Sequence, residues 1–304
     1  MKEASKQDYA PVVHVGGIPF QVTSLELATQ TVLRLSSQKR PISVRFANAY
    51  CVAVANKDPK YCTLLASEGI NFPDGAPIVW FMRRSSSGRG VAGRVRGPSL
   101  FGSVLDSGRG IGIRHFFLGT TDETLKSMIE RVSTQYPGIN IAGSYAPRFG
   151  PVDKEFVKHA TSKILAAEPQ IVWVALGTPK QDFATAKLAE STQIPCVGVG
   201  AAFDFMAGSV PEAPLWMQNN GVEWIFRLAS EPRRLWRRYV FGNLAFLYAV
   251  YRTRSFNRVV TRDQAETEAT KVIDQKHAKP GRAYLLEQSD VNNQSEPAKS
   301  EGLD

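Results

Sequence analysis

Short apolar runs alternate with helix-length polar stretches between residues 42 and 199, and this alternation leaves the chain few possible folds. The apolar runs are 42–46, 70–73, 115–118, 139–142, 171–176 and 196–199. The stretches with the length and pattern of helices are 122–135, 153–167 and 179–190. Short buried strands joined by helices indicate a parallel sheet that is covered on both faces. The sequence therefore predicts an α/β fold, a Rossmann-like open parallel sheet with helices on both faces.

Polar and glycine-rich residues follow the carboxyl ends of the predicted strands. In open parallel sheets, ligands bind in the crevice beyond those ends, which all lie at one edge of the sheet. A binding crevice is therefore expected at this edge. The residues expected to bind a ligand there are Asn48, Gly75, Gly119, Gly177, Thr178, Lys180, Gln181, Gly200 and Asp204.

Asp74 is the first candidate for chemistry, because it follows the apolar run 70–73 directly. A carboxylate at the end of a strand points into the crevice. An enzyme that transfers a group onto a hydroxyl needs a base near that hydroxyl, and a carboxylate can serve. The alternative interpretation is that Asp74 and the glycine after it simply form a turn.

The segment 177–182 ends a strongly apolar run and opens a helix-like stretch. A helix N-terminus offers unpaired amide groups and a positive dipole end, which suit a phosphate. The segment is not a P-loop, and the Gly119-Thr120-Thr121 sequence is not a GxGxxG motif, which argues against a dinucleotide dehydrogenase. The alternative interpretation is that Pro179 has a purely structural role at the first helical turn.

An arginine-rich loop lies near a Ser-Ser-Ser-Gly sequence that is typical of a mobile segment. The arginines of this loop are Arg83, Arg84, Arg89, Arg94 and Arg96. Arginines on such a loop can close over a diphosphate, or they can simply be solvated. The chain contains no Asp-x-Asp motif that would hold a divalent ion, so arginines and helix dipoles are expected to replace a metal.

The net charge of +9 is concentrated near the C-terminus, because the segment 227–262 carries +8 of it. Aromatic residues alternate with the arginines there, and the apolar run 239–251 is too short to cross a bilayer. A basic helix with an aromatic face indicates a segment that lies in a membrane interface. The alternative is a pair of helices packed on the sheet with solvated arginines.

The residues expected to contact an anionic membrane surface are Arg233, Arg234, Trp236, Arg237, Arg238 and Tyr239. After residue 262 the chain becomes polar, which predicts a disordered tail. The predicted organisation is a catalytic domain at 1–213, a basic helical appendage at 214–262 and a tail at 263–304.

The three cysteines show neither a CxxC motif nor a metal-ligand spacing, so reduced thiols of a cytoplasmic protein are expected. The first ten residues are polar and lack the apolar core of a signal peptide. None of the four histidines is assigned a catalytic role, and no cofactor or metal is expected. His115 is expected in a strand.

The chain resembles the WecG/TagA/CpsF family, glycosyltransferase family 26, from about residue 42 to residue 239. The motifs that carry the resemblance are Asn71-Phe72-Pro73-Asp74-Gly75, Arg94-Val95-Arg96-Gly97, Phe117-Leu118-Gly119, Tyr136-Pro137-Gly138, Gly177-Thr178-Pro179-Lys180-Gln181 and Val199-Gly200-Ala201-Ala202-Phe203-Asp204. Further matches are Ala213-Pro214, Glu223-Trp224, Arg227, Glu231-Pro232 and Arg237-Arg238-Tyr239.

This resemblance implies an inverting, metal-independent transferase that uses a UDP-sugar donor. It implies transfer of N-acetylmannosamine, its uronic acid or a hexose to a saccharide linked to undecaprenyl diphosphate, in cell-surface polysaccharide assembly. By the same resemblance, Asp74 is the base and Arg94 and Gln181 belong to the site. Glu223 and Arg227, which match the C-terminal motif, are expected to bind donor or acceptor. The basic appendage is expected to hold the enzyme at the inner face of the bacterial plasma membrane.

The chain departs from the family pattern at three places. Phe46 stands where threonine is common, Asp182 follows Gln181 where glutamate is usual, and an acidic residue common near Ser99 is missing. These departures concern the contacts to sugar and acceptor, not the class of reaction.

Two other functions compete with catalysis. The chain is alternatively a non-catalytic module that senses a nucleotide or a lipid at a membrane surface, but the presence of Asp74 favours an enzyme. The basic segment also suggests a nucleic-acid binder. Its alternation of arginines with apolar stretches favours a lipid interface over a groove that follows phosphates, so nucleic acid is not expected as a partner.

Overall fold

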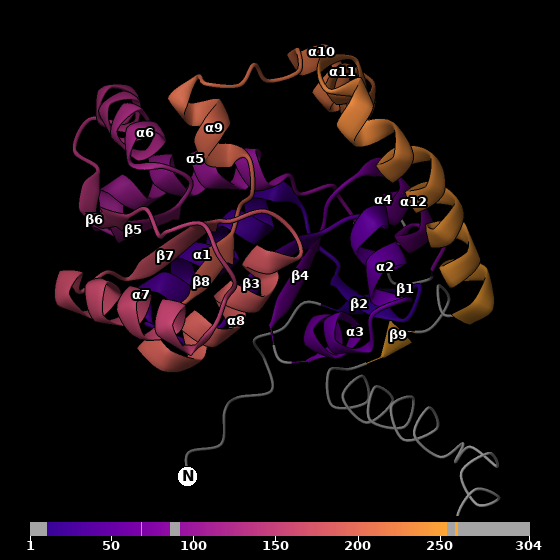
Figure 1. Cartoon of the computed structure of the whole chain (residues 1–304), viewed down its shortest axis with the longest axis horizontal. Coiled ribbons are helices and arrows are strands. Elements are labelled where there is room, and N and C mark those ends of the chain that lie inside the picture. The colour runs from indigo at the N-terminus through magenta and orange to yellow at the C-terminus, as the bar shows by residue number, and fades with distance from the viewer. Residues whose placement is uncertain (1–10, 68, 86–91, 254–258, 261–304) are drawn as a thin grey trace, which may run out of the picture.

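A computed structural model describes residues 11–67, 69–85, 92–253 and 259–260 of the 304-residue chain. The predicted tail at 263–304 and Arg89 of the arginine-rich loop lie outside these residues. The described chain forms a six-stranded parallel sheet with helices around it, together with a smaller three-stranded sheet (Figure 1).

The larger sheet has the strand order β4-β3-β8-β7-β5-β6, and every neighbouring pair is parallel. The strands are β3 (Ser43–Ala47), β4 (Ile70–Pro73), β5 (Arg114–Gly119), β6 (Asn140–Tyr145), β7 (Ile171–Ala175) and β8 (Cys196–Gly198). The six predicted apolar runs are therefore confirmed as strands. Because all strands run the same way, their carboxyl ends share one edge, as the sequence predicts.

Helices cover both faces of this sheet, because successive apolar side chains of β7 point to opposite faces and both faces must be buried. Trp173 belongs to the apolar cluster on one face, whereas Val172 and Val174 belong to the cluster on the other. The helices of the first face are α1 (Leu25–Ser37), α5 (Gly97–Gly108), α6 (Asp122–Gln135) and α9 (Ala202–Ala207). The helices of the second face are α7 (Lys154–Ala167) and α8 (Lys180–Thr192).

Side-chain caps fix the starts of two predicted helices. The Thr121 hydroxyl accepts a hydrogen bond from the amide of Thr124 at 3.2 Å, and α6 begins directly after it. The Asp153 carboxylate accepts one from the amide of Phe156 at 2.8 Å, and α7 follows. Each cap satisfies an amide that has no partner within the helix.

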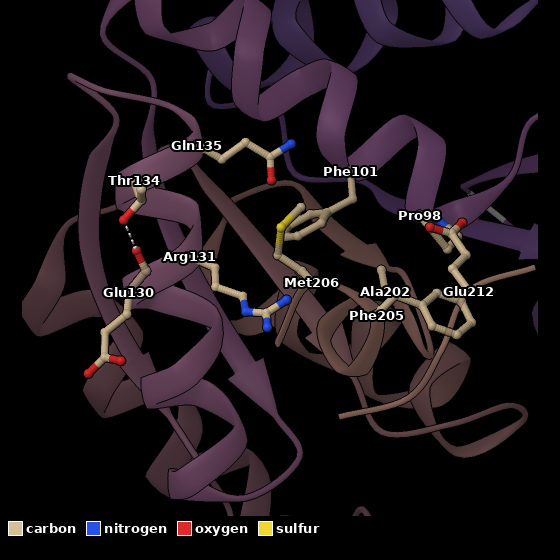
Figure 2. Close-up of a pocket in the computed structure, with 10 residues that line it drawn as sticks. All are labelled: Pro98, Phe101, Glu130, Arg131, Thr134, Gln135, Ala202, Phe205, Met206 and Glu212. Carbon is tan, nitrogen blue, oxygen red and sulfur yellow. Dashed lines mark hydrogen bonds between the residues drawn. The ribbon is translucent and has the colours of Figure 1, made fainter. Parts of the chain in front are cut away.

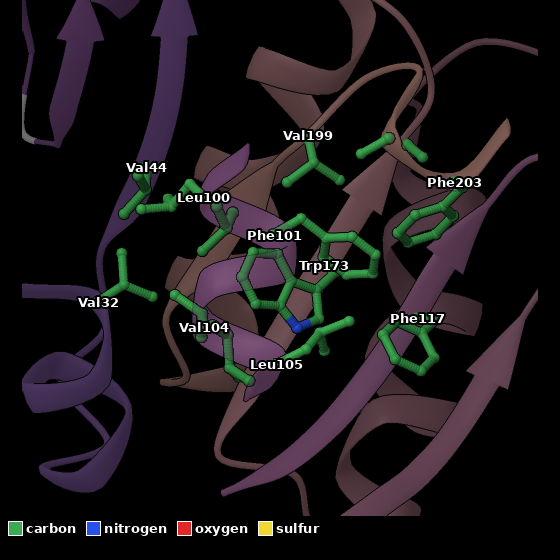
Figure 3. Packing of buried hydrophobic residues seen from close by; sticks show 14 of the residues in the cluster. Val32, Val44, Leu100, Phe101, Val104, Leu105, Phe117, Trp173, Val199 and Phe203 are labelled. Carbon is green, nitrogen blue, oxygen red and sulfur yellow. The ribbon is translucent and has the colours of Figure 1, made fainter. Parts of the chain in front are cut away.

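Aromatic side chains fill the core between α5, α9 and the sheet (Figure 3). The rings of Phe101 and Trp173 meet edge to face at 5.0 Å, and those of Phe117 and Phe203 do so at 5.8 Å. Burial of each such ring stabilises the fold by about 2–3 kcal/mol. His115 lies in β5 as predicted and accepts the Trp173 indole N–H at 3.1 Å, and burial lowers its pKa to about 4.

A second, smaller sheet pairs a strand near the start of the described chain with the strand at its end. The small sheet has the order β2-β1-β9, all antiparallel, with β1 (Val12–Val15), β2 (Ile18–Gln21) and β9 (Val259–Val260). The helices α2 (Ala49–Ala55), α3 (Pro59–Ala66) and α4 (Ala76–Met82) pack with it. The short 3-10 helix η1 spans Arg109–Ile111.

The C-terminal helices lie across the molecule from α6 (Figure 1). They are α10 (Leu215–Asn219), α11 (Glu223–Ser230) and α12 (Pro232–Thr253). One face of α12 packs on α2 and α4 through Phe246, Ala249 and Val250, and the rings of Phe81 and Phe246 lie 5.6 Å apart. Within the described residues, none of the helices has the length and apolar character needed to span a bilayer.

Candidate active site

The candidate site is the edge of the larger sheet where its strands end. Asp74 follows β4, Gly119 is the last residue of β5, and Gly177 and Gly200 follow β7 and β8, so all four lie at the strand ends that the sequence predicts. Gly119 has a φ of +135°, and a Cβ there would lie 2.2 Å from the carbonyl oxygen of Ala175. Only glycine lets the two neighbouring chain segments approach so closely at this edge.

Asp74 is surrounded by charged side chains from two different parts of the chain. Burial raises the pKa of its carboxyl group, and the nearby Glu223 carboxylate raises it further. Three guanidinium groups act in the opposite direction and lower it: Arg94, Arg227 and Arg96. The structure therefore brings four predicted site residues together: Asp74, Arg94, Glu223 and Arg227. A carboxyl group with a raised pKa in such surroundings is suited to accept a proton.

Arg96 ties the C-terminal segment to this edge of the sheet. Its guanidinium donates to Glu223 at 2.7 and 3.0 Å, to Glu212 at 2.7 Å and to Ser99 at 3.0 Å. It also donates to the side-chain oxygen of Gln218. The sequence shows Arg96 as one arginine of a loop and of the Arg94-Val95-Arg96-Gly97 motif, but it does not show that this side chain is buried between two carboxylates.

Arg94 reaches the same segment by a different contact. Its guanidinium donates to the backbone carbonyl of Gln218, at the C-terminal half of α10. Gln218 in turn donates its side-chain amide to the carbonyl of Ala213 at 2.6 Å. Both arginines of the Arg-Val-Arg motif thus hold α10 beside Asp74.

Gln181 lies in the first turn of α8 and is buried. Its side-chain N–H group points to the carbonyl of Gly198 and the hydroxyl of Thr178, both at 3.4 Å. Its side-chain oxygen is also buried and accepts no hydrogen bond from any described residue. A buried acceptor without a partner costs free energy, so this oxygen is the atom of Gln181 that would gain from a donor.

Lys180 extends from the same helix start toward an aromatic ring. Its ammonium group lies 5.3 Å from the ring centre of Phe149, which is fully exposed on the loop between β6 and α7. An exposed phenylalanine beside a cation at a binding edge offers a flat surface for a base or a sugar. Sequence reasoning missed Phe149, although a lone aromatic residue between arginine, glycine and proline was a usable signal.

Asp204 and Asn48 have different partners in the structure. Burial raises the pKa of Asp204, and a hydrogen bond from Thr120 lowers it, so these two residues meet beside the ends of β5 and β8. The side chain of Asn48 instead accepts hydrogen bonds from the amides of Tyr50 and Cys51, at 3.0 and 3.2 Å. Asn48 therefore caps α2, and the structure gives it a helix-starting role beside the crevice.

A cavity of about 600 Å³ opens between α5, α6 and α9 (Figure 2). Its lining residues are Pro98, Phe101, Glu130, Arg131, Thr134, Gln135, Ala202, Phe205, Met206 and Glu212. Glu212 binds Arg96, and the Arg227 guanidinium lies 5.2 Å from the ring centre of Phe205. The cavity therefore adjoins the groups around Asp74. Sequence reasoning missed it, because its polar wall comes from the last two turns of α6, an ordinary amphipathic helix.

Two departures from the family pattern have a structural explanation. The Asp182 carboxylate is buried and accepts a hydrogen bond from the Tyr61 hydroxyl of α3 at 2.6 Å. Burial raises the pKa of Asp182 to about 6. Phe46 packs against Phe72 with a ring distance of 5.9 Å. Both residues therefore contact buried aromatic side chains of the protein, Asp182 by a hydrogen bond and Phe46 by ring packing.

The predicted membrane residues are described only in part. Arg233 and Trp236 are exposed on α12, whereas the side chains of Arg234, Arg237, Arg238 and Tyr239 lie outside the described structure. Large apolar side chains are exposed along α10, α11 and α12. They are Leu215, Trp216, Trp224, Ile225, Trp236, Phe241, Leu244, Leu247, Tyr248 and Tyr251. An apolar surface of this kind marks a site of interaction.

Within residues 11–67, 69–85, 92–253 and 259–260, no three side chains of histidine, cysteine, aspartate or glutamate come together in a way that would hold an ion. None of the three cysteines, all of them among the described residues, forms a disulfide.

The chain matches the family model described as "Glycosyl transferase WecG/TagA/CpsF family" over residues 13–259. It is also similar to an N-acetylglucosaminyldiphosphoundecaprenol N-acetyl-beta-D-mannosaminyltransferase of Bacillus spizizenii, with 36% identity over 60% of this chain and 69% of the relative. A relative with the same name from Bacillus subtilis is 31% identical, over 66% of this chain and 76% of that protein.

Proposed function

Because this chain belongs to the WecG/TagA/CpsF family of glycosyl transferases, we propose that it transfers a sugar from a UDP-linked donor to a saccharide carried on undecaprenyl diphosphate. The names of the two Bacillus relatives favour N-acetylmannosamine as the sugar and N-acetylglucosaminyldiphosphoundecaprenol as the acceptor. The observation that carries the proposal is the group of charges around Asp74.

In the proposed reaction, Asp74 takes the proton of the acceptor hydroxyl while that oxygen attacks the anomeric carbon of the donor sugar. The bond between that carbon and the diphosphate of UDP breaks, and the anomeric configuration inverts. Negative charge then develops on the leaving diphosphate. Arg94 and Arg227, both close enough to lower the pKa of Asp74, supply the positive charge that neutralises it.

The donor is proposed to lie along the ends of β5, β7 and β8. The start of α8 offers amide groups to a phosphate. The buried oxygen of Gln181 needs a donor, which a phosphate lacks at neutral pH and which a sugar hydroxyl or acetamido N–H provides. Protection of the protein against thermal unfolding by a panel of UDP-sugars tests donor choice, because a bound donor stabilises the fold. UDP release with a lipid-linked acceptor tests the reaction itself.

We expect activity to persist when all divalent ions are removed. The chain has no Asp-x-Asp motif, and the arginines beside Asp74 replace the charge that a metal would supply. The measurement is UDP release in excess chelator, compared with the same assay containing magnesium or manganese. Activity that vanishes with chelator and returns with either ion would contradict the proposal.

We propose that the exposed apolar face of α10–α12 and its arginines hold the enzyme on an anionic membrane, at the inner face of the plasma membrane. Changing Arg233, Arg234, Arg237 and Arg238 to glutamine should then release the protein from anionic vesicles. Each basic residue near such a surface contributes about 1 kcal/mol, and salt screens it. Activity on a long-chain lipid acceptor should fall, and activity on a water-soluble short-chain acceptor should change less.

Vesicle co-sedimentation at low and high salt measures this binding. A matched control changes four exposed lysines of α6 and α7 to glutamine: Lys126, Lys154, Lys158 and Lys163. This control alters the net charge equally and should leave binding to the vesicles unchanged. The proposal would be contradicted if both variants were released equally, or if binding of the parent protein did not depend on salt. Either result would indicate a purely structural role for α12.

A further inference from the structure

Arg96 makes the most extensive set of side-chain contacts at the candidate site. Its side chain is only 7% exposed, and it binds Glu212, Gln218 and Glu223. These partners come from the linker after α9, from α10 and from α11, which lie 116 to 127 residues farther along the chain. A planar guanidinium that donates to two carboxylates and an amide fixes the position of each.

The two carboxylates bound to Arg96 have different surroundings. The Glu223 side chain is 16% exposed. Burial is the largest cause of the raised pKa of Asp74, and the Glu223 carboxylate is the second. The Glu212 side chain is 36% exposed and lines the cavity beside α5. Both accept a hydrogen bond of 2.7 Å from the same guanidinium. Glu223 therefore lies near the proposed base, whereas Glu212 faces the cavity, and both bind the same guanidinium. Glu212 can therefore serve as the control for Glu223.

We propose that Arg96 and Glu223 form a latch that holds α11 over Asp74, and that Glu223 is a positioning residue that acts on the reaction through Asp74. This inference rests on the proposed role of Asp74 as the base. It assigns Glu223 to a protein contact, whereas the sequence motif alone predicts a contact with donor or acceptor.

The physical consequence follows from repulsion between like charges. A second carboxylate beside Asp74 makes the loss of its proton less favourable, so the ionised group binds a proton more tightly and is a stronger base. Three guanidinium groups face Asp74 as well, Arg94 and Arg96 from the segment before α5 and Arg227 from α11, and they oppose this effect. Because Glu223 belongs to α11, the base strength of Asp74 depends on the latch being closed.

The test compares Glu223→Gln with Glu212→Gln in the full-length protein. Glutamine keeps an oxygen that can accept from Arg96 but removes the negative charge. In the parent protein, kcat/KM should rise with pH as Asp74 loses its proton. In Glu223→Gln this rise should move to lower pH, and kcat above the rise should fall because Asp74 is a weaker base. In Glu212→Gln the rise should stay at the pH that it has in the parent protein, because Glu212 is not among the groups that shift the pKa of Asp74.

Glu223→Asp is the conservative variant, since it keeps the charge on a shorter side chain. The pH at which kcat/KM rises in Glu223→Asp should lie closer to the value in the parent protein than to the value in Glu223→Gln. A Glu223→Gln profile that drops equally at every pH, with no movement of the rise, would overturn the proposal, and so would equal movement in both glutamine variants. Thermal unfolding of each variant shows that the fold is retained.

The outcome for Asp74→Asn separates this inference from the proposed function. If Asp74→Asn keeps normal turnover, Asp74 is not the base and the proposed mechanism fails. If Asp74→Asn is inactive and Glu223→Gln leaves the pH profile in place, the inference about the latch fails and the proposed function stands.

Discussion

Changing Asp74 to asparagine should lower turnover by about a hundredfold or more, in line with the contribution of a positioned general base. Asparagine has nearly the same shape, so the fold and the binding of the donor should remain. The chain beside Asp74 is also fixed independently of the side chain, because the Asp74 amide donates to the carbonyl of Ala47 at 3.0 Å. Single-turnover UDP release and thermal protection by the donor measure the two quantities separately.

The pH profile of the parent protein provides a second check on Asp74. The ionised carboxylate is the active form of a base, and burial together with Glu223 raises its pKa above the usual value of 3.8. Activity should therefore be lost as the pH falls through this raised pKa. Normal turnover in Asp74→Asn, or an acid limb that persists in that variant's residual activity, would assign the proton transfer to another group.

Changing Arg96 to methionine should lower the free energy of unfolding by about 3 kcal/mol. Removing one partner of a buried ion pair leaves the other charges without compensation, which typically costs 3–5 kcal/mol, and the partial exposure of Glu212 favours the lower value. Turnover should fall as well, because α10 and α11 lose the contact that holds them beside Asp74. Urea unfolding measures the first effect and UDP release the second.

An exposed ion pair elsewhere in the chain provides the control for Arg96→Met. Arg109 pairs with Asp106 three residues earlier, and their side chains are 35% and 56% exposed. Arg109→Met should cost less than about 1 kcal/mol, because water and salt already weaken such a pair. Arg96→Lys should be intermediate, since lysine keeps the charge but not the planar set of donors. Equal costs for Arg96→Met and Arg109→Met would mean that the latch adds no stability.

The larger sheet could be predicted because each of its strands carries a local signal. Most of its strands are buried and mainly apolar. The predicted helices α6 and α7 are amphipathic and begin after a capping side chain, and α8 begins after Pro179, so a short stretch of sequence contains each signal. The small sheet was not predicted. Its strand β1 pairs Val12 with Val260 across almost the whole chain, and no local pattern encodes such a contact. The Gly16-Gly17 pair between β1 and β2 was nevertheless a hairpin signal.

The candidate site shows the same division. Asp74, Arg94 and Gln181 lie in short motifs at strand ends or beside them, so the sequence alone predicts them as site residues. The contact between Arg96 and Glu223 could not be predicted from the sequence, because no local pattern shows that two residues 127 positions apart are in contact. For Asn48, the sequence pattern was consistent with two roles. Its place after a strand predicts a ligand contact, but an asparagine at that place also starts a helix, and the structure shows the cap.

The pairing of β1 with β9 has a consequence for the order in which the protein is completed during synthesis. A growing chain exposes β1 early, but β1 gains its second neighbour only when residues 259 and 260 have left the ribosome. The partners of Arg96 on α10 and α11 also emerge long after Arg96 itself. Because folding during synthesis proceeds from the N-terminus, every strand of the larger sheet is available before α10 and α11 reach Asp74. We therefore expect the nascent chain to be inactive until α10 and α11 have emerged.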